Sequence, residues 1–368
     1  MELQNFIQNN DNYIDKFKEL KLYVRKYSVL GLALVKSYKN EKYENDKYPW
    51  IKYCRGAIIN IKTNKLICIP PQKACEIEDL KAILDDININ DDFEEYKYKY
   101  QPLLDGTMIN MFYHNDKWMI STRSNIGAKN YWDGHIPFNV MFEEVVGNNW
   151  FNLLDKECCY SFVLQHKKNR IISNVIENKV IMVEKYKLGD DIHICELEEI
   201  PGIERIIDLD IKYLNNYNKN LEYSVKGFTI KNNDIRYNWI NPNYNYVRSL
   251  KMNSNNNFLN YINLRKQWLL KDYLIYFPED KDLFTLYKNY IDNLINNLYI
   301  NYVNLKIRKN ITIKDIEYSF RPLINELHKI YQTKDTKITK AIVKTYINKM
   351  DGKRLIFIIQ HYTGLKIN

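Results

Sequence analysis

The first 250 residues place short apolar stretches between polar turns, a pattern that is typical of many short β-strands. Lys62-Thr63-Asn64 and His114-Asn115-Asp116 each stand between two such stretches, so we expect a hairpin at both places. Amphipathic helices are expected within residues 1–20 and 137–147. Many short antiparallel strands with a few helices predict an α+β domain. The expected strands lie within residues 21–36, 51–60, 65–70, 96–123, 159–166, 179–186 and 222–248, with an Asn-rich surface loop at 209–221.

Beyond about residue 250 the apolar residues recur at three- and four-residue steps, which is typical of amphipathic helices. One such series is Leu283, Leu286, Tyr290, Leu294 and Leu298. Helices are expected over 257–277, 281–307, 313–331 and 336–350. Pro278 is placed to open the second of them and Thr339 to cap the fourth. We therefore expect two domains, an α+β domain over 1–250 and an all-α domain over 251–368.

The composition is basic and rich in tyrosine. The chain has 368 residues, with 54 Lys and Arg against 45 Asp and Glu, a net charge of +9, and 31 tyrosines. A basic balance favours a polyanion such as RNA, and tyrosine rings can stack on bases. An AT-rich coding sequence would also favour Lys, Asn, Ile and Tyr, so both interpretations stay open.

The cysteines and the hydropathy bear on metal binding and on the cellular compartment. Six cysteines are present without a Cys-x-x-Cys pair, so we expect no zinc site and no other metal site. No apolar run is long enough to span a bilayer and the N-terminus shows no secretory pattern, so reduced thiols are expected. The sequence therefore predicts a cytoplasmic protein without a membrane partner.

Seven short motifs follow one another between residues 53 and 244. Their order and spacing resemble those of the covalent nucleotidyltransferases, and most of all the RNA ligases of phages and large viruses. The resemblance covers about two-thirds of the chain and implies a ligase-like antiparallel-sheet domain ahead of the helical one, in a viral protein of the host cytoplasm. The motifs are Tyr53-Cys54-Arg55-Gly56, Pro70-Pro71-Gln72-Lys73, Leu103-Leu104-Asp105-Gly106-Thr107, Ser121-Thr122-Arg123-Ser124, Phe162-Val163-Leu164 with Asn169-Arg170-Ile171, Lys226-Gly227-Phe228-Thr229-Ile230, and the segment from Asn238 to Tyr244.

The resemblance also shows where this chain departs from the family. Ligases of this kind attach AMP to the lysine that opens the KxDG motif, because the deprotonated amine attacks the α-phosphate. Leu103 stands at that position and has no nucleophile. Lys97 and Lys99 face the same side of an extended strand as residue 103. Even Lys99 is roughly 13 Å away along the strand, whereas attack requires atoms about 3–3.5 Å apart.

Other positions that serve catalysis in the family differ as well. Val163 and Lys226 stand where the resemblance implies glutamates that help to hold a metal ion or the ribose. Asn238 and Ile240 stand where it implies two lysines that neutralise phosphate charge in the transition state. We therefore expect a pseudoenzyme with no catalytic residue, in which the fold is kept for binding.

The residues that remain in the motifs and in the basic loop after them are the expected nucleotide- or RNA-binding residues. Arginine and lysine can hold phosphate by charge-assisted hydrogen bonds, and indole rings can stack on bases. Each has a plainer interpretation: Asp-Gly is a common turn, a basic loop can be merely solvated, and some aromatic residues must be core. The set is Arg55, Lys73, Asp105, Gly106, Arg123, Lys167, Lys168, Arg170, Lys226 and Trp239.

Three functions remain open at this point. The first is a non-catalytic module that binds an RNA end, a nucleotide or a cap-like ligand and uses no cofactor. The second is an active ligase that uses ATP and magnesium with a relocated lysine. The third is a protein-assembly subunit that docks a partner protein through the helical domain.

Overall fold

The computed structural model describes most of the chain as two compact units, Met1–Asn245 and Tyr246–Asn368, and each is treated by itself. The Asn-rich loop expected at 209–221 falls almost entirely outside the described residues, and so does Lys97. Among the described residues, no helix combines the length and the apolar character needed to cross a membrane. The described residues are 2–38, 41, 43, 47–84, 98–132, 136–147, 150–189, 192–210, 221–232, 235–252 and 256–364.

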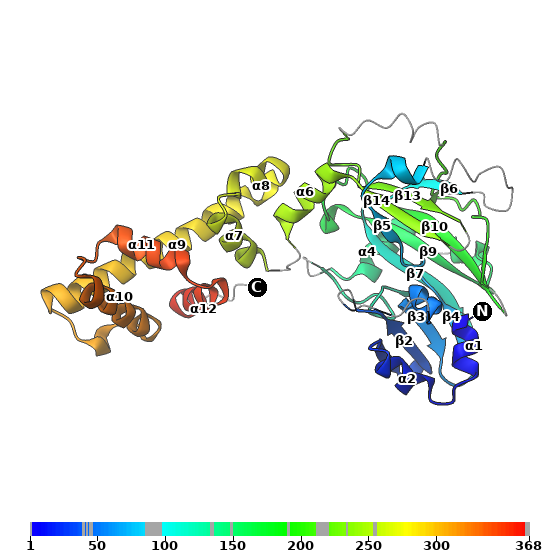
Figure 1. Ribbon diagram of the computed structural model, residues 1–368, viewed down its shortest axis with the longest axis horizontal. Coiled ribbons are helices and arrows are strands. Elements are labelled where there is room, and N and C mark those ends of the chain that lie inside the picture. The colour runs from blue at the N-terminus through cyan, green and yellow to red at the C-terminus, as the bar shows by residue number, and fades with distance from the viewer. Residues whose placement is uncertain are drawn as a thin grey trace. The chain divides into compact units, whose positions relative to one another are not determined.

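The first sheet of the N-terminal unit is antiparallel, in the order β1-β2-β3-β4. Gly31 adopts φ 67° between its first two strands, the left-handed turn that glycine takes without a steric penalty. Helices α1 (Glu2–Gln8) and α2 (Tyr13–Glu19) pack beside this sheet and share its core (Figure 1). The strands are β1 (Tyr23–Tyr27), β2 (Leu32–Lys36), β3 (Arg55–Asn60) and β4 (Lys65–Cys68).

The second sheet has the order β11-β10-β9-β7-β8, with β12 paired in parallel to β10. Asn115 and Asp116 have positive φ angles between β7 and β8, as a two-residue hairpin turn requires. Helix α4 (Phe138–Val146) contributes buried residues to the core of this sheet. The strands are β7 (Thr107–His114), β8 (Lys117–Ser121), β9 (Cys158–Gln165), β10 (Lys179–Leu188), β11 (Ile192–Ile194) and β12 (Glu204–Arg205).

The third sheet, in the order β5-β14-β13-β6, brings the expected motifs together. Its β5 (Cys75–Ile77) pairs in parallel with β14 (Arg236–Ile240), and the other pairs are antiparallel. Just beyond β6 (Lys99–Pro102), Leu103 N–H donates to the carbonyl of Gly227 at 2.9 Å, at the start of β13 (Gly227–Lys231). The motif around Leu103 therefore lies directly beside the motif around Gly227.

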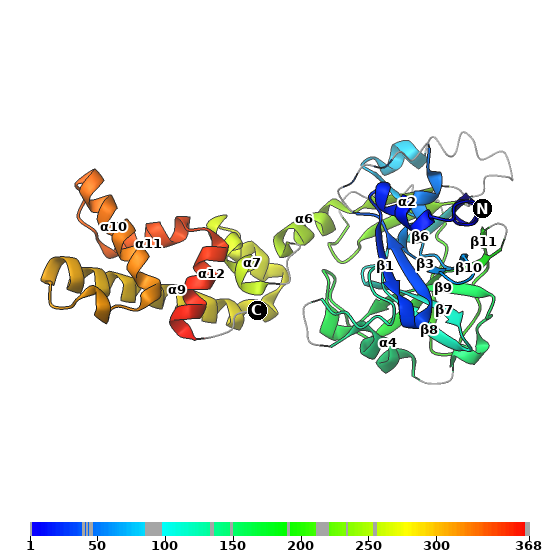
Figure 2. The same ribbon diagram turned by 90° about the horizontal axis from the view of Figure 1, so that it is seen from below.

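The C-terminal unit is helical (Figure 2). Thr339 and Asp351 cap two of its helices, because their side-chain oxygens accept hydrogen bonds from backbone N–H groups of the first turn. The helix that carries the unit boundary is α6 (Pro242–Lys251). The others are α7 (Asn257–Lys266), α8 (Leu270–Tyr276), α9 (Lys281–Tyr302), which continues as a π-helical turn over Val303–Arg308, α10 (Arg321–Lys334), α11 (Lys340–Lys349) and α12 (Gly352–Thr363).

The expected α+β class, with a helical C-terminal region, is confirmed, and so are both hairpins and the Thr339 cap. One strand assignment and two helix assignments are wrong; among the latter, the helix expected over 313–331 begins only at Arg321, after two 3₁₀ turns. The strand expected to continue to residue 248 ends at Ile240, and α6 begins at Pro242, because proline fits the first turn of a helix. The helix expected over 257–277 is two helices, interrupted at Trp268, whose φ of 63° does not continue an α-helix.

The buried face of α9 also differs from the expected series. Leu286, which the series includes, is 44% exposed. The residues that face the core are Phe284, Tyr287, Ile291, Leu294, Ile295, Leu298 and Tyr302. Phe284 and Tyr287 fill the part of the buried stripe that the expected series had assigned to Leu283 and Leu286, since an aromatic ring buries a large apolar area.

The turn before β7 is tightly packed at Gly106, and a substitution there tests this. A Cβ atom at this glycine, whose φ is 152°, would lie 2.5 Å from Val163 Cγ1 and 2.7 Å from the carbonyl oxygen of Leu164. We expect Gly106→Ala to lower the free energy of unfolding by about 2 kcal/mol or more, because no rotamer relieves a clash with backbone. Urea denaturation measures this. The control Gly189→Ala meets no atom within 4 Å and should shift the value by less than about 0.5 kcal/mol; equal losses would contradict the argument.

Candidate functional site

The carboxylate of Asp105 is fully engaged within the N-terminal unit. Its Oδ2 accepts hydrogen bonds from the N–H groups of Ile172 and Ser173, both at 3.0 Å. Its Oδ1 accepts one from the Tyr244 hydroxyl at 2.6 Å and lies 4.0 Å from Lys226 Nζ. The residue is only 9% exposed. Asp105 therefore joins the turn before β7, the loop after β9 and the first turn of α6.

A cavity of about 300 Å³ opens beside this carboxylate. Its lining includes Asp105, Gly106, Gln165, Asn169 and Lys179. Gln165 Nε2 donates to the Asp105 carbonyl at 2.7 Å, and Asn169 Nδ2 donates to Thr107 Oγ1 at 2.9 Å. These contacts fix the wall of the cavity. They also place the Asp-Gly motif beside the Asn-Arg motif, which lies more than sixty positions later in the sequence.

The positions that depart from ligase chemistry surround the same turn. Val163 packs in an apolar cluster with Ile181 and Val183, with Leu104 beside it. A carboxylate at position 163 would be buried against hydrocarbon, where ionisation is unfavourable. Lys226 Nζ donates to the Leu104 carbonyl at 2.9 Å, so this amine lies beside the residue that follows Leu103.

A second feature, which we call the arginine cluster, consists of Lys36, Arg55, Arg123 and Arg236. Lys36 at the end of β2 pairs in register with Arg55 at the start of β3. Gly56 then lets the backbone at Arg123 approach, since a Cβ there would lie 2.9 Å from the Arg123 Cα. Arg123 donates to the Ser37 carbonyl at 2.8 Å. Pairing of strands thus gathers cations that stand far apart in the sequence.

The electrostatics of the arginine cluster are unfavourable without an anion. Burial, and then repulsion by Arg123 and Arg236, lowers the pKa of Arg55 to about 10, with Glu76 opposing the shift. Burial also lowers the pKa of Arg123, and burial with repulsion by Arg123 lowers that of Lys36. In addition, Arg123 Nε is buried and has no hydrogen-bond partner in the described structure. A bound anion would relieve both the repulsion and the unsatisfied donor.

Arg236 differs from the rest of the cluster because it has a buried counter-charge. Glu184 on β10 forms ion pairs with Arg236 and with Lys231, the latter at 2.7 Å, and accepts a hydrogen bond from Tyr186. Burial alone would raise the pKa of Glu184, but Arg236 and Lys231 bring it down to about 2. This ion pair network joins the second sheet to the third. Within the arginine cluster, it leaves three members, Lys36, Arg55 and Arg123, without an Asp or Glu within 4.0 Å among the described residues.

The other expected binding residues fall into separate places. Lys73 lies in the loop after β4, and Lys167 and Lys168 are exposed on the turn after β9, where Lys168 lies 3.8 Å from Glu144. Arg170 donates to the carbonyl of Ile172 at 3.1 Å. None of these is described in contact with the arginine cluster, so the structure does not form a single site from the whole expected set.

Trp239 requires a correction. It was expected to be available for base stacking, but it is 7% exposed and stacks on Phe228, with ring centroids 5.9 Å apart. Its alternation with Asn238 along β14 places the ring on the core side. On the other side, Asn238 accepts a hydrogen bond from Thr229 at 2.9 Å, and Ile240 pairs with Gly227.

Three of the residues that now matter were missed from the sequence: Lys36, Glu184 and Arg236. A signal existed for Arg236, since it shares a strand face with Asn238 and Ile240. No signal identified the pairing of Lys36 with Arg55, because a period of two gives the face of a residue but not its neighbour on the next strand. Within the described residues, no group of three or more His, Cys, Asp and Glu side chains could hold a metal ion.

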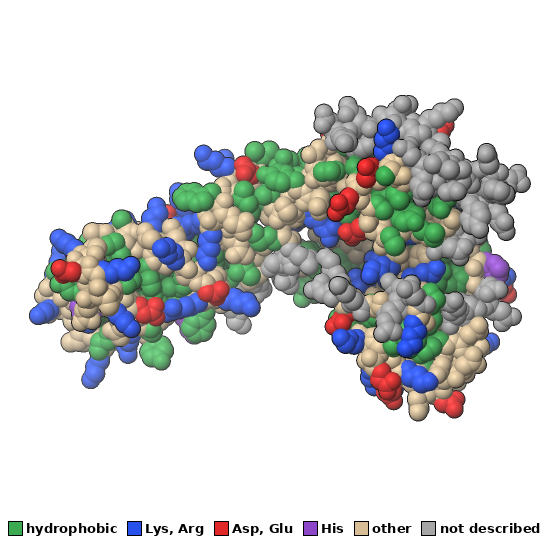
Figure 3. All heavy atoms as spheres, in the orientation of Figure 1, with side chains coloured by type: hydrophobic (Ala, Val, Ile, Leu, Met, Phe, Trp, Pro, Cys, Tyr) green, Lys and Arg blue, Asp and Glu red, His purple; other side chains and the backbone are tan. Residues whose placement is uncertain are grey.

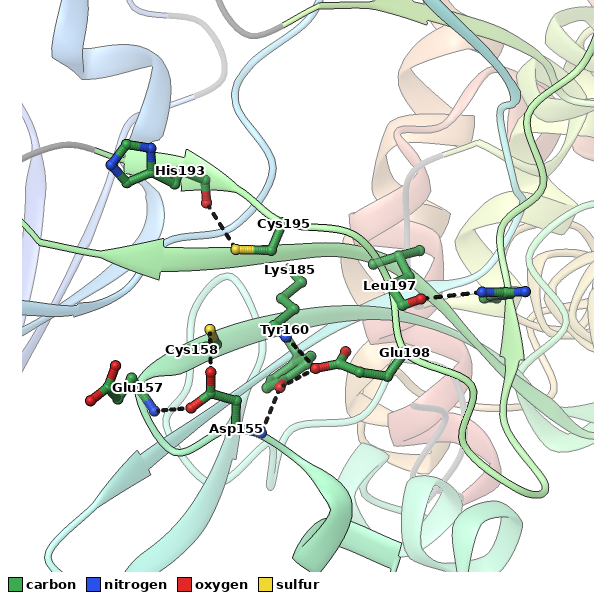
Figure 4. A network of polar contacts seen from close by, with 10 residues as sticks. Asp155, Glu157, Cys158, Tyr160, Lys185, His193, Cys195, Leu197 and Glu198 are labelled. Carbon is green, nitrogen blue, oxygen red and sulfur yellow. Dashed lines mark hydrogen bonds and ion pairs between the residues drawn. The ribbon is translucent and has the colours of Figure 1, made fainter.

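A further polar network joins β9, β10 and a following segment (Figure 4). The Tyr160 hydroxyl donates to Glu198 at 3.1 Å and accepts from the Asp155 N–H at 2.8 Å. Lys185 also pairs with Glu198, and Cys158 Sγ donates to Asp155 at 3.4 Å. Burial, foremost, raises the pKa of Tyr160. Because these contacts join β9, β10 and the segment that carries Glu198, we assign this network to holding the sheet together, although Glu198 Oε2 is buried without a hydrogen-bond partner in the described structure.

Glu184 gives a test of the charge balance beside the arginine cluster. Its pKa falls from 4.5 to about 2 on folding, so its stabilisation is complete above pH 4.5 and is lost as the pH falls towards 2. We expect this term to be on the order of 3 kcal/mol. Glu184→Gln should cost about 3–5 kcal/mol at neutral pH and flatten the acid limb of the stability curve.

Urea denaturation between pH 2.5 and 7 measures both effects. The control is Glu157→Gln, whose partner Lys187 is exposed, and which should cost less than about 1 kcal/mol. If the stability of Glu184→Gln still falls at acid pH as in the unaltered protein, other carboxylates cause that loss.

Comparisons with known proteins relate part of this chain to a ligase-like protein. No protein-family model matches the chain. Over 174 residues it is 25% identical to a protein of Autographa californica nuclear polyhedrosis virus described as a "Putative bifunctional polynucleotide kinase/RNA ligase", a match that covers 44% of this chain and 24% of that protein. The chain thus spans about a quarter of the length of that relative.

A solved structure described as a "Putative ATP-dependent DNA ligase from Aquifex aeolicus" aligns with 88% of this chain and 80% of its own chain, at 9% identity and a TM-score of 0.41. That likeness is too weak to support an argument about this protein. The sequence match supports a relationship to ligase-like proteins, and the function of this chain has to be argued from its own residues.

Proposed function

We propose that the N-terminal unit is a non-catalytic, RNA ligase-like module that binds the phosphate of an RNA end, a nucleotide or a cap-like ligand. The observation that carries the proposal is the arginine cluster. Lys36, Arg55 and Arg123 lie together with no described Asp or Glu within 4.0 Å, and Arg123 Nε is buried and has no described hydrogen-bond partner. Guanidinium groups offer a planar fork of N–H donors that matches phosphate oxygens. A phosphate would therefore supply the missing charge and the missing acceptor together.

The surroundings of Leu103 support the non-catalytic part of the proposal. The side chain at this position has no nucleophile, and Val163 occupies an apolar cluster where the family resemblance implies a carboxylate. Asp105, which remains, uses both carboxylate oxygens for hydrogen bonds within the fold. Val163 thus serves packing and Asp105 serves tethering, which suits a fold kept for binding rather than for adenylyl transfer.

One observation favours a second candidate, an active ligase with a relocated lysine. Lys226 Nζ donates to the carbonyl of Leu104 at 2.9 Å, and this amine is closer to the lost nucleophile position than Lys99, which is exposed on β6. Lys226 also lies 4.0 Å from Asp105 Oδ1. An ammonium group held by these oxygens has no lone pair for attack on phosphorus. The first proposal is therefore the stronger one.

Covalent labelling separates the two candidates. The protein is incubated with α-labelled ATP and magnesium or manganese, denatured and separated from free nucleotide. We expect no label on the chain, because Leu103 has no amine, while an authentic ligase run alongside is labelled. A labelled chain whose label is lost in Lys226→Met but kept in Lys99→Met would establish Lys226 as the nucleophile and overturn the non-catalytic assignment.

Binding of phosphate tests the arginine cluster directly. We expect Arg123→Gln to weaken binding of a 5′-phosphorylated oligoribonucleotide about tenfold or more, since it removes a charged donor. The matched control is Arg205→Gln, because Arg205 is exposed and paired with Glu199.

Calorimetric titration gives both affinities. Titration with the same strand carrying a 5′-hydroxyl shows how much the terminal phosphate contributes to the affinity. Equal affinity of Arg123→Gln and the unaltered protein for the phosphorylated strand would remove the cluster from the proposal.

A further inference from the structure

The surplus positive charge of this protein belongs to the helical unit. Residues 246–368 contain 21 Lys and Arg against 10 Asp and Glu, a net charge of +11. Residues 1–245 contain 33 Lys and Arg against 35 Asp and Glu, a net charge of −2. These two values give the +9 of the whole chain. The unit with the arginine cluster is thus almost neutral overall, and the basic balance calls for a separate explanation in the helices.

Three of the ten acidic residues of the helical unit are engaged in contacts within it. Asp315 closes a capping box with Thr312, and Asp351 accepts hydrogen bonds from the first backbone N–H groups of α12. Glu326 pairs with Arg354 at 2.6 Å and accepts from Tyr346 at 2.5 Å. Capping and tethering therefore use carboxylates that could otherwise neutralise the exposed lysines.

Unneutralised cations gather where α9 ends. Lys306, Arg308 and Lys309 stand on or directly after the π-helical turn Val303–Arg308, and Lys314 follows. None of the four has an Asp or Glu within 4.0 Å among the described residues. Lys306 is close enough to His328 on α10 to help lower the pKa of that imidazole, after burial. The cations thus extend from the end of α9 towards α10.

Flat rings lie among these cations. Tyr318 is 78% exposed, and the guanidinium of Arg321 lies 5.7 Å from the centre of its ring. Tyr331 is 43% exposed and stacks on His328, with centroids 5.7 Å apart and an interplanar angle of 19°. Arg321 and His328 are seven residues apart on α10, so they lie on one side of that helix. Exposed rings beside cations are what successive bases of a single strand stack on.

We propose that the helical unit binds single-stranded nucleic acid through a basic–aromatic face made of Lys306, Arg308, Lys309, Tyr318, Arg321 and Tyr331. The cations hold the phosphate backbone and the two tyrosines stack on bases. Lys and Arg side chains are spread over this end of the helical unit with few Asp or Glu between them (Figure 3). The face acts on its own and does not depend on the phosphate site of the N-terminal unit.

A nucleic acid fits this face better than a lipid surface does. A helix that lies on a membrane buries a continuous apolar side below its basic residues. Here Leu323, Ile324 and Leu327 of α10 are buried inside the unit, and the exposed aliphatic side chains among the cations are Ile307 and Ile313, one on each side of Lys309 in the sequence. The exposed rings are tyrosines in contact with Arg or His, which suits stacking with a polar edge in water. A vesicle arm in the experiment tests the alternative.

The test measures binding of a fluorescent 20-nucleotide strand to the full chain by anisotropy, with U20 and dT20 as separate arms. Both strands carry a 5′-hydroxyl, so failure of the phosphate site leaves this result unchanged. Lys306→Gln, Arg308→Gln and Lys309→Gln combined should lower the affinity at least about tenfold and reduce the salt slope by about 2, since each phosphate contact contributes about 0.7. If U20 binds and dT20 does not, the face also recognises the ribose 2′-hydroxyl.

Stacking is tested by Tyr318→Leu with Tyr331→Leu, which should weaken binding about fivefold or more and leave the salt slope unchanged. The matched charge control combines Lys62→Gln, Lys81→Gln and Lys117→Gln, three exposed lysines of the N-terminal unit. It should keep the affinity within about twofold. Circular dichroism confirms that each variant keeps its helices.

Three results would overturn the proposal. The first is an unaltered protein that binds neither strand at 0.1 M salt. The second is a charge control that loses as much affinity as the triple variant of the face. The third is a protein that binds vesicles rich in anionic lipid but neither strand.

Discussion

The N-terminal unit depends on one buried carboxylate, that of Asp105. It accepts two backbone N–H groups from the loop after β9 and the hydroxyl of Tyr244, and Lys226 lies 4.0 Å away. A buried charge is tolerated only when it is hydrogen-bonded and paired, so these four groups must stay in place together. The turn before β7, the cavity wall and the start of α6 are consequently fixed relative to one another. Asp105 thus has a structural role in the fold, since both of its carboxylate oxygens are used for contacts within the unit.

The cations of this unit occupy two contrasting environments. Arg236 and Lys231 share the buried Glu184, and that network is balanced by its own charges. Lys36, Arg55 and Arg123 lie nearby without such a partner, and the lowered pKa values record burial and mutual repulsion. Repulsion of this kind is unfavourable in the free protein, and persists where a ligand offsets it. This contrast is the physical reason to propose an anion beside Lys36, Arg55 and Arg123 and not beside Arg236 and Lys231.

The two proposed contacts differ because charge is arranged differently in the two units. The N-terminal unit has almost no net charge, and its proposed site depends on a few partly buried donors in fixed positions. The helical unit has a net charge of +11 and presents cations and rings on its surface, which suits a longer and less specific contact. A phosphate held in one unit and a strand held by the other would be consistent with a protein that handles RNA ends.

The sequence by itself determined the features that depend on neighbouring residues. It gave the α+β class, the turns at Lys62-Thr63-Asn64 and His114-Asn115-Asp116, and the Thr339 cap, because turn chemistry, capping and periodicity act within a few positions. It also determined that Leu103 cannot be a nucleophile. Tertiary structure alone decided which side chains meet. Pairing of strands set Lys36 beside Arg55, folding buried Trp239, and sheet packing gave Arg236 its partner Glu184. These contacts join residues from 19 to 52 positions apart, and a local pattern reports which face a residue takes but not what lies opposite it.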